Sequence, residues 1–108
     1  MKNSFNKIKI GVVGLGQRGK GLLETLLAID AFEIVAVCDC YQDRVDRAFE
    51  IITNQQAVAP RKYADFEAFI KDEEMQATLI ASSWDAHVEM AIRSMEEGKI
   101  TALEFVFG

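Results

Sequence analysis

Apolar residues gather along this chain in short blocks that predict strands separated by amphipathic segments. The predicted strands are Lys7–Val13, Glu33–Cys38, Lys62–Ala64, Ala77–Ala81 and Ile100–Val106. The second of these blocks is unbroken in hydrophobicity, as expected for a strand of a parallel sheet that helices cover on both faces. The block at residues 62–64 is short, and we expect it to form an edge strand.

Between the strands, apolar residues recur at the three- and four-residue intervals of an amphipathic helix. The helices predicted in this way cover about Gln17–Ile29, Asp43–Asn54, Phe66–Ile70 and Ala86–Glu97. The last of these helices is expected to end at Gly98, a residue suited to a left-handed cap. Its expected buried positions are Val88, Ala91, Ile92 and Met95.

Strands that alternate with helices indicate an α/β protein with a parallel, doubly wound sheet of the Rossmann type. Right-handed crossover connections leave few topologies, and we expect the strand order 3-2-1-4-5. In such a sheet a ligand binds at the carboxyl ends of the strands, at the switch point between the first and fourth strands. With 108 residues, the chain is expected to form one domain with its own core.

The first predicted strand ends in a glycine-rich turn that leads into a helix. The residues of the turn are Gly14, Leu15, Gly16, Gln17, Arg18 and Gly19. Gly14 permits a tight turn, Gly16 lets the backbone approach a pyrophosphate, and Gly19 lets the helix pack close to the strand. We expect the N–H groups of residues 15–18 to face the phosphates of a dinucleotide. The Arg18 side chain either adds a charge-assisted contact to these phosphates or stays solvated on the first turn of the helix.

An acidic residue, Asp39, closes the second strand about 20 residues after the glycine turn, the spacing of a dinucleotide-binding unit. A carboxylate at this position accepts hydrogen bonds from ribose hydroxyls and repels the 2′-phosphate of NADP. The sequence therefore predicts NAD, with NADP the weaker alternative. Arg44 is the residue that would favour NADP, although its place at a helix start suits pairing with an acid.

The loop after the fourth strand carries further polar and aromatic residues beside the expected cofactor. Ser82 and Ser83 are expected to reach the nicotinamide-side ribose or phosphate, and Trp84 to lie against the cofactor. His87, the only histidine, either serves acid–base catalysis or is a packed residue that hydrogen-bonds a neighbouring loop. Gly11 and Gly21 are expected to ease the packing of helices on the sheet.

Composition narrows the range of partners. A formal net charge of −5 argues against non-specific electrostatic binding of nucleic acid. No run approaches the roughly 18 apolar residues that span a membrane, and the N-terminus has no apolar leader region. We therefore expect a cytoplasmic protein. Cys38 and Cys40 are expected to stay reduced thiols, and no metal site is predicted.

Four segments of the chain resemble the Gfo/Idh/MocA-type family, named after glucose–fructose oxidoreductase and inositol dehydrogenase. The segments are GVVGLGQRGKG, VAVCDCYQDRVDRA, YADFEAFI and ASSWDAHVEMAIRSMEEGK. The resemblance implies that residues 1–108 form an NAD(P)-binding Rossmann domain. It also implies that the family's C-terminal domain, which binds sugar-like substrates, is absent, so that the chain is truncated and without useful turnover by itself.

Two motifs depart from the family pattern. Ser82 and Ser83 stand where Thr-Pro is usual, although His87 is in register with the family histidine. Glu104 matches the glutamate of a Glu-Lys-Pro motif, but Phe105 stands in place of the lysine that supports hydride transfer. The resemblance leaves His87 and Glu104 as candidates for catalysis, and both residues are also expected near the cofactor.

The stretch Trp84–His87 is similar to the Trp-Glu-Trp-His segment of NAD-dependent glycosidases of the α-N-acetylgalactosaminidase type, which also lack the lysine. In that branch, a tightly held NAD transiently oxidises the sugar, elimination cleaves the glycosidic bond, and the cofactor is restored. The resemblance therefore implies either a dehydrogenase or a glycosidase as the parent enzyme.

Four functions follow from the sequence. The first is the NAD-binding domain of an oxidoreductase that acts on sugar- or polyol-like substrates, and the second is the same domain of an NAD-dependent glycosidase. A stand-alone nucleotide-binding module is the third. A methyltransferase is the fourth, because those enzymes also place glycines after the first strand and an acid after the second. Loss of a partner domain would expose apolar surface near the last strand, so a homo-oligomer is also expected.

Overall fold

A computed structural model describes residues 7–81 and 84–103. It contains one sheet of five parallel strands in the order β3-β2-β1-β4-β5, which confirms the predicted topology. The strands are β1 (Ile8–Val13), β2 (Phe32–Cys38), β3 (Arg61–Tyr63), β4 (Ala77–Ile80) and β5 (Ile100–Leu103). The predicted end of the last strand, at residues 104–106, lies outside the described residues.

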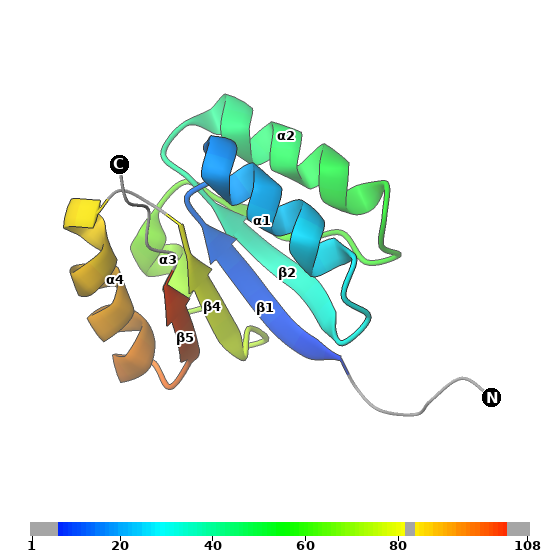
Figure 1. Cartoon of the computed structure of the whole chain (residues 1–108). Coiled ribbons are helices and arrows are strands. Elements are labelled where there is room, and N and C mark those ends of the chain that lie inside the picture. The colour runs from blue at the N-terminus through cyan, green and yellow to red at the C-terminus, as the bar shows by residue number, and fades with distance from the viewer. Residues whose placement is uncertain (1–6, 82–83, 104–108) are drawn as a thin grey trace.

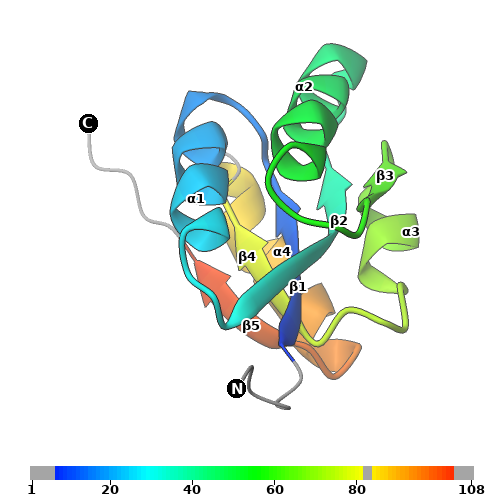
Figure 2. The same ribbon diagram turned by 90° about the vertical axis from the view of Figure 1, so that its right-hand side faces the viewer.

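Four helices connect the strands and cover both faces of the sheet (Figures 1 and 2). They are α1 (Gln17–Leu27), α2 (Gln42–Thr53), α3 (Phe66–Ile70) and α4 (Trp84–Glu96). The pair α1 and α2 lies on one face, and the pair α3 and α4 lies on the other. Since successive side chains of a strand point to opposite faces, each face of the sheet has its own apolar core.

The outer helix α4 differs from the sequence prediction in the face that it buries. Val88, Ile92 and Met95 were expected inside but have exposed fractions of 60%, 48% and 58%. Among the α4 residues whose side chains are described, the buried ones are Ala91, as predicted, and Ser94, and such small side chains let a helix lie close to a sheet. Gly98 follows the helix with a φ of +79°, so its predicted role as a left-handed cap is confirmed.

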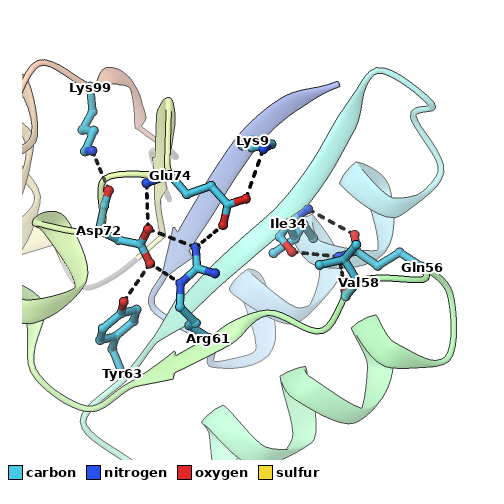
Figure 3. Close-up of polar contacts among 9 residues, drawn as sticks. All are labelled: Lys9, Ile34, Gln56, Val58, Arg61, Tyr63, Asp72, Glu74 and Lys99. Carbon is cyan, nitrogen blue, oxygen red and sulfur yellow. Dashed lines mark hydrogen bonds and ion pairs between the residues drawn. The ribbon is translucent and has the colours of Figure 1, made fainter. Parts of the chain in front are cut away.

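A polar network holds the amino-terminal edge of the sheet together (Figure 3). The carboxylate of Asp72 accepts hydrogen bonds from the Arg61 guanidinium, from the Tyr63 hydroxyl at 2.7 Å and from the Glu74 N–H at 3.0 Å. Lys99 Nζ donates to the Asp72 carbonyl oxygen at 2.7 Å. Burial by itself would raise the pKa of Asp72, but these hydrogen bonds outweigh it and hold the pKa below its ordinary value.

A second polar contact completes an irregular stretch of β2 (Figure 3). The register between β1 and β2 shifts after Ile10, and β3 is too short to pair with the first half of β2. There the Gln56 side chain makes the hydrogen bonds that a neighbouring strand would make to β2. It accepts from the Ile34 N–H at 3.1 Å and donates to the Ile34 carbonyl at 2.8 Å. The network around Asp72 and the Gln56 contact both lie away from the carboxyl edge of the sheet. That edge is left free for a ligand.

Candidate functional site

The glycine turn begins where β1 ends, at the carboxyl edge of the sheet. Gly14 adopts a φ of +91°, a left-handed conformation that strains any residue with a Cβ, so its predicted role in the tight turn is explained by its backbone. The Gly14 N–H donates to the Cys38 carbonyl at 3.0 Å. This hydrogen bond fixes the start of the turn to the end of the neighbouring strand β2.

Of the other two glycines of the turn, Gly19 is the one needed for the close approach of α1. A Cβ on Gly19 would lie 1.8 Å from the Gly14 carbonyl oxygen, so no side chain fits where α1 crosses the turn. Gly16 has an ordinary φ of −67° and begins α1 without a side-chain cap. A Cβ on Gly16 would approach the Arg44 guanidinium at 3.4 Å. Gly16 and Gly19 therefore contribute backbone and no side chain at this edge.

The two remaining glycines differ from each other. A Cβ on Gly11 would lie 2.0 Å from the Met75 sulfur and 2.9 Å from the Phe69 ring, so Gly11 does allow helix α3 and the following loop to pack on the sheet. Gly21 has no heavy atom within 4 Å of its Cβ position. The expectation of a packing role for Gly21 is therefore wrong.

Asp39 is buried at the end of β2, with an exposed fraction of 7%, and is bonded to the glycine turn. Its Oδ2 accepts the Leu15 N–H at 2.7 Å, and its Oδ1 accepts the Tyr41 N–H at 2.9 Å. The Leu15 N–H was expected to face phosphates, and the structure turns it inward instead. The Leu15 side chain is only 1% exposed and belongs to the core. Leu15 thus shapes the turn from inside.

Two arginines from the start of α2 approach the same turn. Arg44 Nη1 lies 3.9 Å from Asp39 Oδ2, and its guanidinium lies 4.6 Å from the centre of the Tyr41 ring. The expected pairing of Arg44 with an acid is therefore present. Arg47 Nη2 donates to the Leu15 carbonyl at 3.4 Å. Through these contacts, the N-terminal part of α2 is connected to Asp39 and to the glycine turn that leads into α1.

An apolar hollow of about 250 Å³ opens beside Asp39 at the carboxyl edge. Its lining residues are Val13, Gly14, Cys38, Asp39, Cys40, Ala64, Phe66 and Met90. Phe66 and Met90 were not expected as site residues, because they come from separate helices and carry no polar group. A mostly apolar wall with one carboxylate at its rim suits a flat heterocycle joined to a polar sugar.

Of the two cysteines, which were expected to be packed near the strand end, only Cys38 is buried. Both are free thiols, Cys38 buried and Cys40 exposed. Burial raises the pKa of Cys38 to about 12, and the negative charge of Asp39 adds to the rise. Cys38 is therefore a packing residue beneath the hollow. Among residues 7–81 and 84–103, no group of three His, Cys, Asp or Glu side chains could hold a metal ion, and no helix is long and apolar enough to cross a membrane.

For eight of the predicted site residues, the structure describes no side chain. Ser82, Ser83, Glu104 and Phe105 lie outside the described residues. Gln17, Arg18, Trp84 and His87 have a described backbone but no described side chain. Gln17 and Arg18 open α1, while Trp84 and His87 fall in the first turn of α4. The roles of all eight side chains stay predictions.

Comparison with known proteins identifies relatives along almost the whole chain. Residues 8–105 match the model of a family described as "Oxidoreductase family, NAD-binding Rossmann fold". A glycosyl hydrolase family 109 protein of Saccharopolyspora erythraea is 33% identical over 101 residues, which cover 90% of this chain and 22% of that protein. The alpha-N-acetylgalactosaminidase of Shewanella oneidensis is 31% identical over 101 residues, with the same coverage.

Solved structures share the fold. A probable dehydrogenase from Thermotoga maritima aligns with a TM-score of 0.79 and 29% identity, covering 89% of this chain and 27% of that one. The scyllo-inositol dehydrogenase of Lactobacillus casei, solved with NAD(H) and scyllo-inositol, aligns with a TM-score of 0.81 and 22% identity. That alignment covers 91% of this chain and 28% of the dehydrogenase. The chain thus spans less than a third of the proteins that it matches.

Proposed function

Since the chain belongs to the oxidoreductase family with an NAD-binding Rossmann fold, we propose that it holds NAD for a longer enzyme that acts on a sugar-like substrate. The fold and the cofactor class are those of the family. The reaction and the substrate of the whole protein are the proposed part, because the chain spans only 22% of its relatives named as glycosyl hydrolases.

The chain's own residues fit NAD along the carboxyl edge. The pyrophosphate would lie on the N–H groups of Gln17 and Arg18, above Gly16, where no side chain intervenes and the helix dipole is favourable. The ribose hydroxyls of adenosine would donate to Asp39, because each carboxylate oxygen keeps acceptor capacity beyond its one backbone hydrogen bond. The adenine ring would enter the apolar hollow.

The nicotinamide half of NAD would then extend toward the first turn of α4. NAD supplies a hydride acceptor there for a carbon of the substrate. We assign Ser82, Ser83 and Trp84 to cofactor contacts, and His87 and Glu104 to the region where cofactor and substrate meet. Because Phe105 cannot carry a proton, His87 and Glu104 are the candidates for moving one.

The single observation that supports NAD binding best is the lack of room for a side chain at Gly19, where a Cβ would lie 1.8 Å from the Gly14 carbonyl oxygen. A glycine there lets α1 begin close to the turn, so that the backbone N–H groups of its first turn can face a phosphate. Isothermal titration of the 108-residue chain with NAD tests the proposal. Saturable binding of one NAD per chain is expected, and preferential binding of S-adenosylmethionine would overturn the dinucleotide site in favour of a methyltransferase.

Two reactions are candidates for the whole enzyme, oxidation of a polyol and oxidation–elimination at a glycosidic bond. The glycosidase reaction is favoured by the relatives of 31–35% identity, whose names are glycosyl hydrolase family 109 protein and alpha-N-acetylgalactosaminidase. The purified longer protein would be given NAD with either an inositol or an aryl N-acetylgalactosaminide. Release of the aryl alcohol without net NADH identifies the glycosidase, and net NADH from the inositol identifies the dehydrogenase. If neither product forms, both reactions are refuted.

A homo-oligomer and a cytoplasmic location complete the proposal. The exposed apolar side chains of α4 and β5 gather near the carboxyl-terminal part of the chain. They are Val88, Ile92, Met95 and Ile100. Sedimentation velocity over a range of concentrations tests self-association of the chain, and a clean monomer at the highest concentration would contradict it. Cell fractionation with an antibody against the chain tests the location.

A further inference from the structure

Strand β2 is paired along its whole length on one side but only at its carboxyl end on the other. β1 pairs with β2 from Phe32 to Cys38, whereas β3 pairs only with Ala36–Cys38. In the part of the chain that the structure describes, no strand covers the outer side of residues 32–35. Unpaired N–H and C=O groups at such an edge are a template on which another chain can add a strand.

The Gln56 side chain lies against this open part of the edge (Figure 3). We propose that it closes the edge and so prevents a second copy of the chain from pairing with β2. Its Oε1 accepts the Ile34 N–H at 3.1 Å, and its Nε2 donates to the Ile34 carbonyl at 2.8 Å. One carboxamide thus supplies both the acceptor and the donor that a residue of an added strand would supply. The inference does not depend on the proposed cofactor site, because the contact lies away from the carboxyl edge.

Further hydrogen bonds hold the Gln56 side chain in this position. Nε2 also donates to the Val58 carbonyl at 2.7 Å, so both of its hydrogens are used and the orientation of the amide is fixed. The Gln56 backbone N–H donates to the Ile52 carbonyl at 2.9 Å, just after the end of α2. The N–H of Phe32, two residues before Ile34, is bonded to the Ile29 carbonyl at 3.3 Å. The groups of Ile34 are therefore the ones that Gln56 protects.

A second copy of this chain is the partner that fits the exposed groups. A two-fold axis beside Ile34 would place the two copies of this residue opposite each other, and each N–H would donate to the other carbonyl, as in an antiparallel ladder. Glu33 would then lie opposite Val35 of the second copy, so that no like charges meet. Residues 32–35 are Phe-Glu-Ile-Val, mostly types that are enriched in strands. Because the pairing needs the same two groups of Ile34, it and the Gln56 contact exclude each other.

Amide hydrogen exchange followed by NMR, together with sedimentation velocity of the same 108-residue preparations, tests the inference. In the parent, the Ile34 amide should be protected at every concentration. In dilute Gln56→Ala it should exchange at least about tenfold faster, because its hydrogen-bond acceptor is gone. As the concentration of this variant rises, the Ile34 amide should regain protection while the sedimentation coefficient increases. Gln55→Ala, which removes an exposed glutamine from the neighbouring position, is the matched control and should behave as the parent does.

Two results would overturn the inference. The first is an Ile34 amide that exchanges in the parent as fast as the amides of exposed loops, since the edge would then be open. The second is a Gln56→Ala chain, folded by circular dichroism, that associates no more than the control and regains no protection of Ile34. Association through α4 and β5 would act on the parent and both variants alike, so only the difference between Gln56→Ala and Gln55→Ala counts. Should Gln56→Ala unfold, Gln56→Asn, whose carboxamide is one methylene too short to reach Ile34, takes its place with the same expectation.

Discussion

Gly19→Ala is the substitution that tests most sharply whether the glycine turn is built as described. The new Cβ would lie 1.8 Å from the Gly14 carbonyl oxygen and 2.9 Å from its carbonyl carbon. Both atoms belong to the backbone of the turn, so no side-chain rotation relieves the clash. Either the turn or α1 has to recede until the separation reaches at least 3.0 Å.

The free energy of this clash can be estimated from its parts. Overpacking of a well-packed site costs about 1–3 kcal/mol, and the better helix propensity of alanine returns about 1 kcal/mol. The net loss of folding stability is therefore small, about 0–2 kcal/mol. Binding suffers more, because each N–H hydrogen bond to a charged phosphate contributes about 1.5–3 kcal/mol and depends on the position of the turn. We expect NAD affinity to fall at least about tenfold.

The assay combines calorimetric NAD titration with urea unfolding of the same preparations. Gly21→Ala is the matched control, since it lies on the same helix and no heavy atom lies within 4 Å of its Cβ position. It should stabilise the fold by about 0.5–1 kcal/mol and leave NAD affinity unchanged. Gly19→Ala that binds NAD within about twofold of the parent, with an unchanged unfolding midpoint, would refute the reasoning.

Three further substitutions or labelling experiments probe the rest of the account. Asp72→Asn should destabilise the fold by about 1–3 kcal/mol. Because folding lowers the pKa of Asp72, its ionised carboxylate stabilises the parent above the unfolded pKa, and this stabilisation is lost as pH falls through the folded pKa. The urea midpoints of variant and parent should therefore converge in acid, and parallel midpoint-against-pH curves would contradict this. Asp39→Ala should weaken NAD at least about tenfold by freeing the Leu15 N–H and removing the ribose acceptor, and unchanged calorimetric affinity would exclude both roles. Iodoacetamide at about pH 8 should alkylate Cys40 and spare Cys38, whose thiol is buried with a pKa of about 12; equal labelling of the two in peptide mass maps would contradict that burial.

The topology and the glycine turn could be predicted from the sequence because they rest on local signals. An unbroken apolar run such as the one in β2 marks a buried parallel strand, and the glycines at positions 14 and 19 follow from steric limits that apply there. The role of Gly21 was predicted wrongly for the opposite reason. A glycine in a helix signals close packing only if something lies against it, and the sequence does not say what lies there.

Features that depend on tertiary contacts could not be predicted. Helical periodicity places Ala91 on one face with the larger Val88 and Ile92, but in the packing of α4 on β4 and β5 only Ala91 of these three is buried. The inward Leu15 N–H depends on where the Asp39 carboxylate lies after the strands pair. Phe66 and Met90 meet at the apolar hollow from distant segments, and neither carries a group that would mark it in a sequence.

We propose that NAD lies along the carboxyl edge of this sheet, on the glycine turn and beside Asp39. An amide nitrogen–proton correlation spectrum of the labelled 108-residue chain, recorded during NAD titration, tests it most directly. We predict saturable shifts of the amide signals of Gly16, Gly19 and Cys40, with those of Asp72 and Lys99 at the opposite edge unchanged. Shifts confined to the opposite edge, or no shifts at saturating NAD, would contradict the claim.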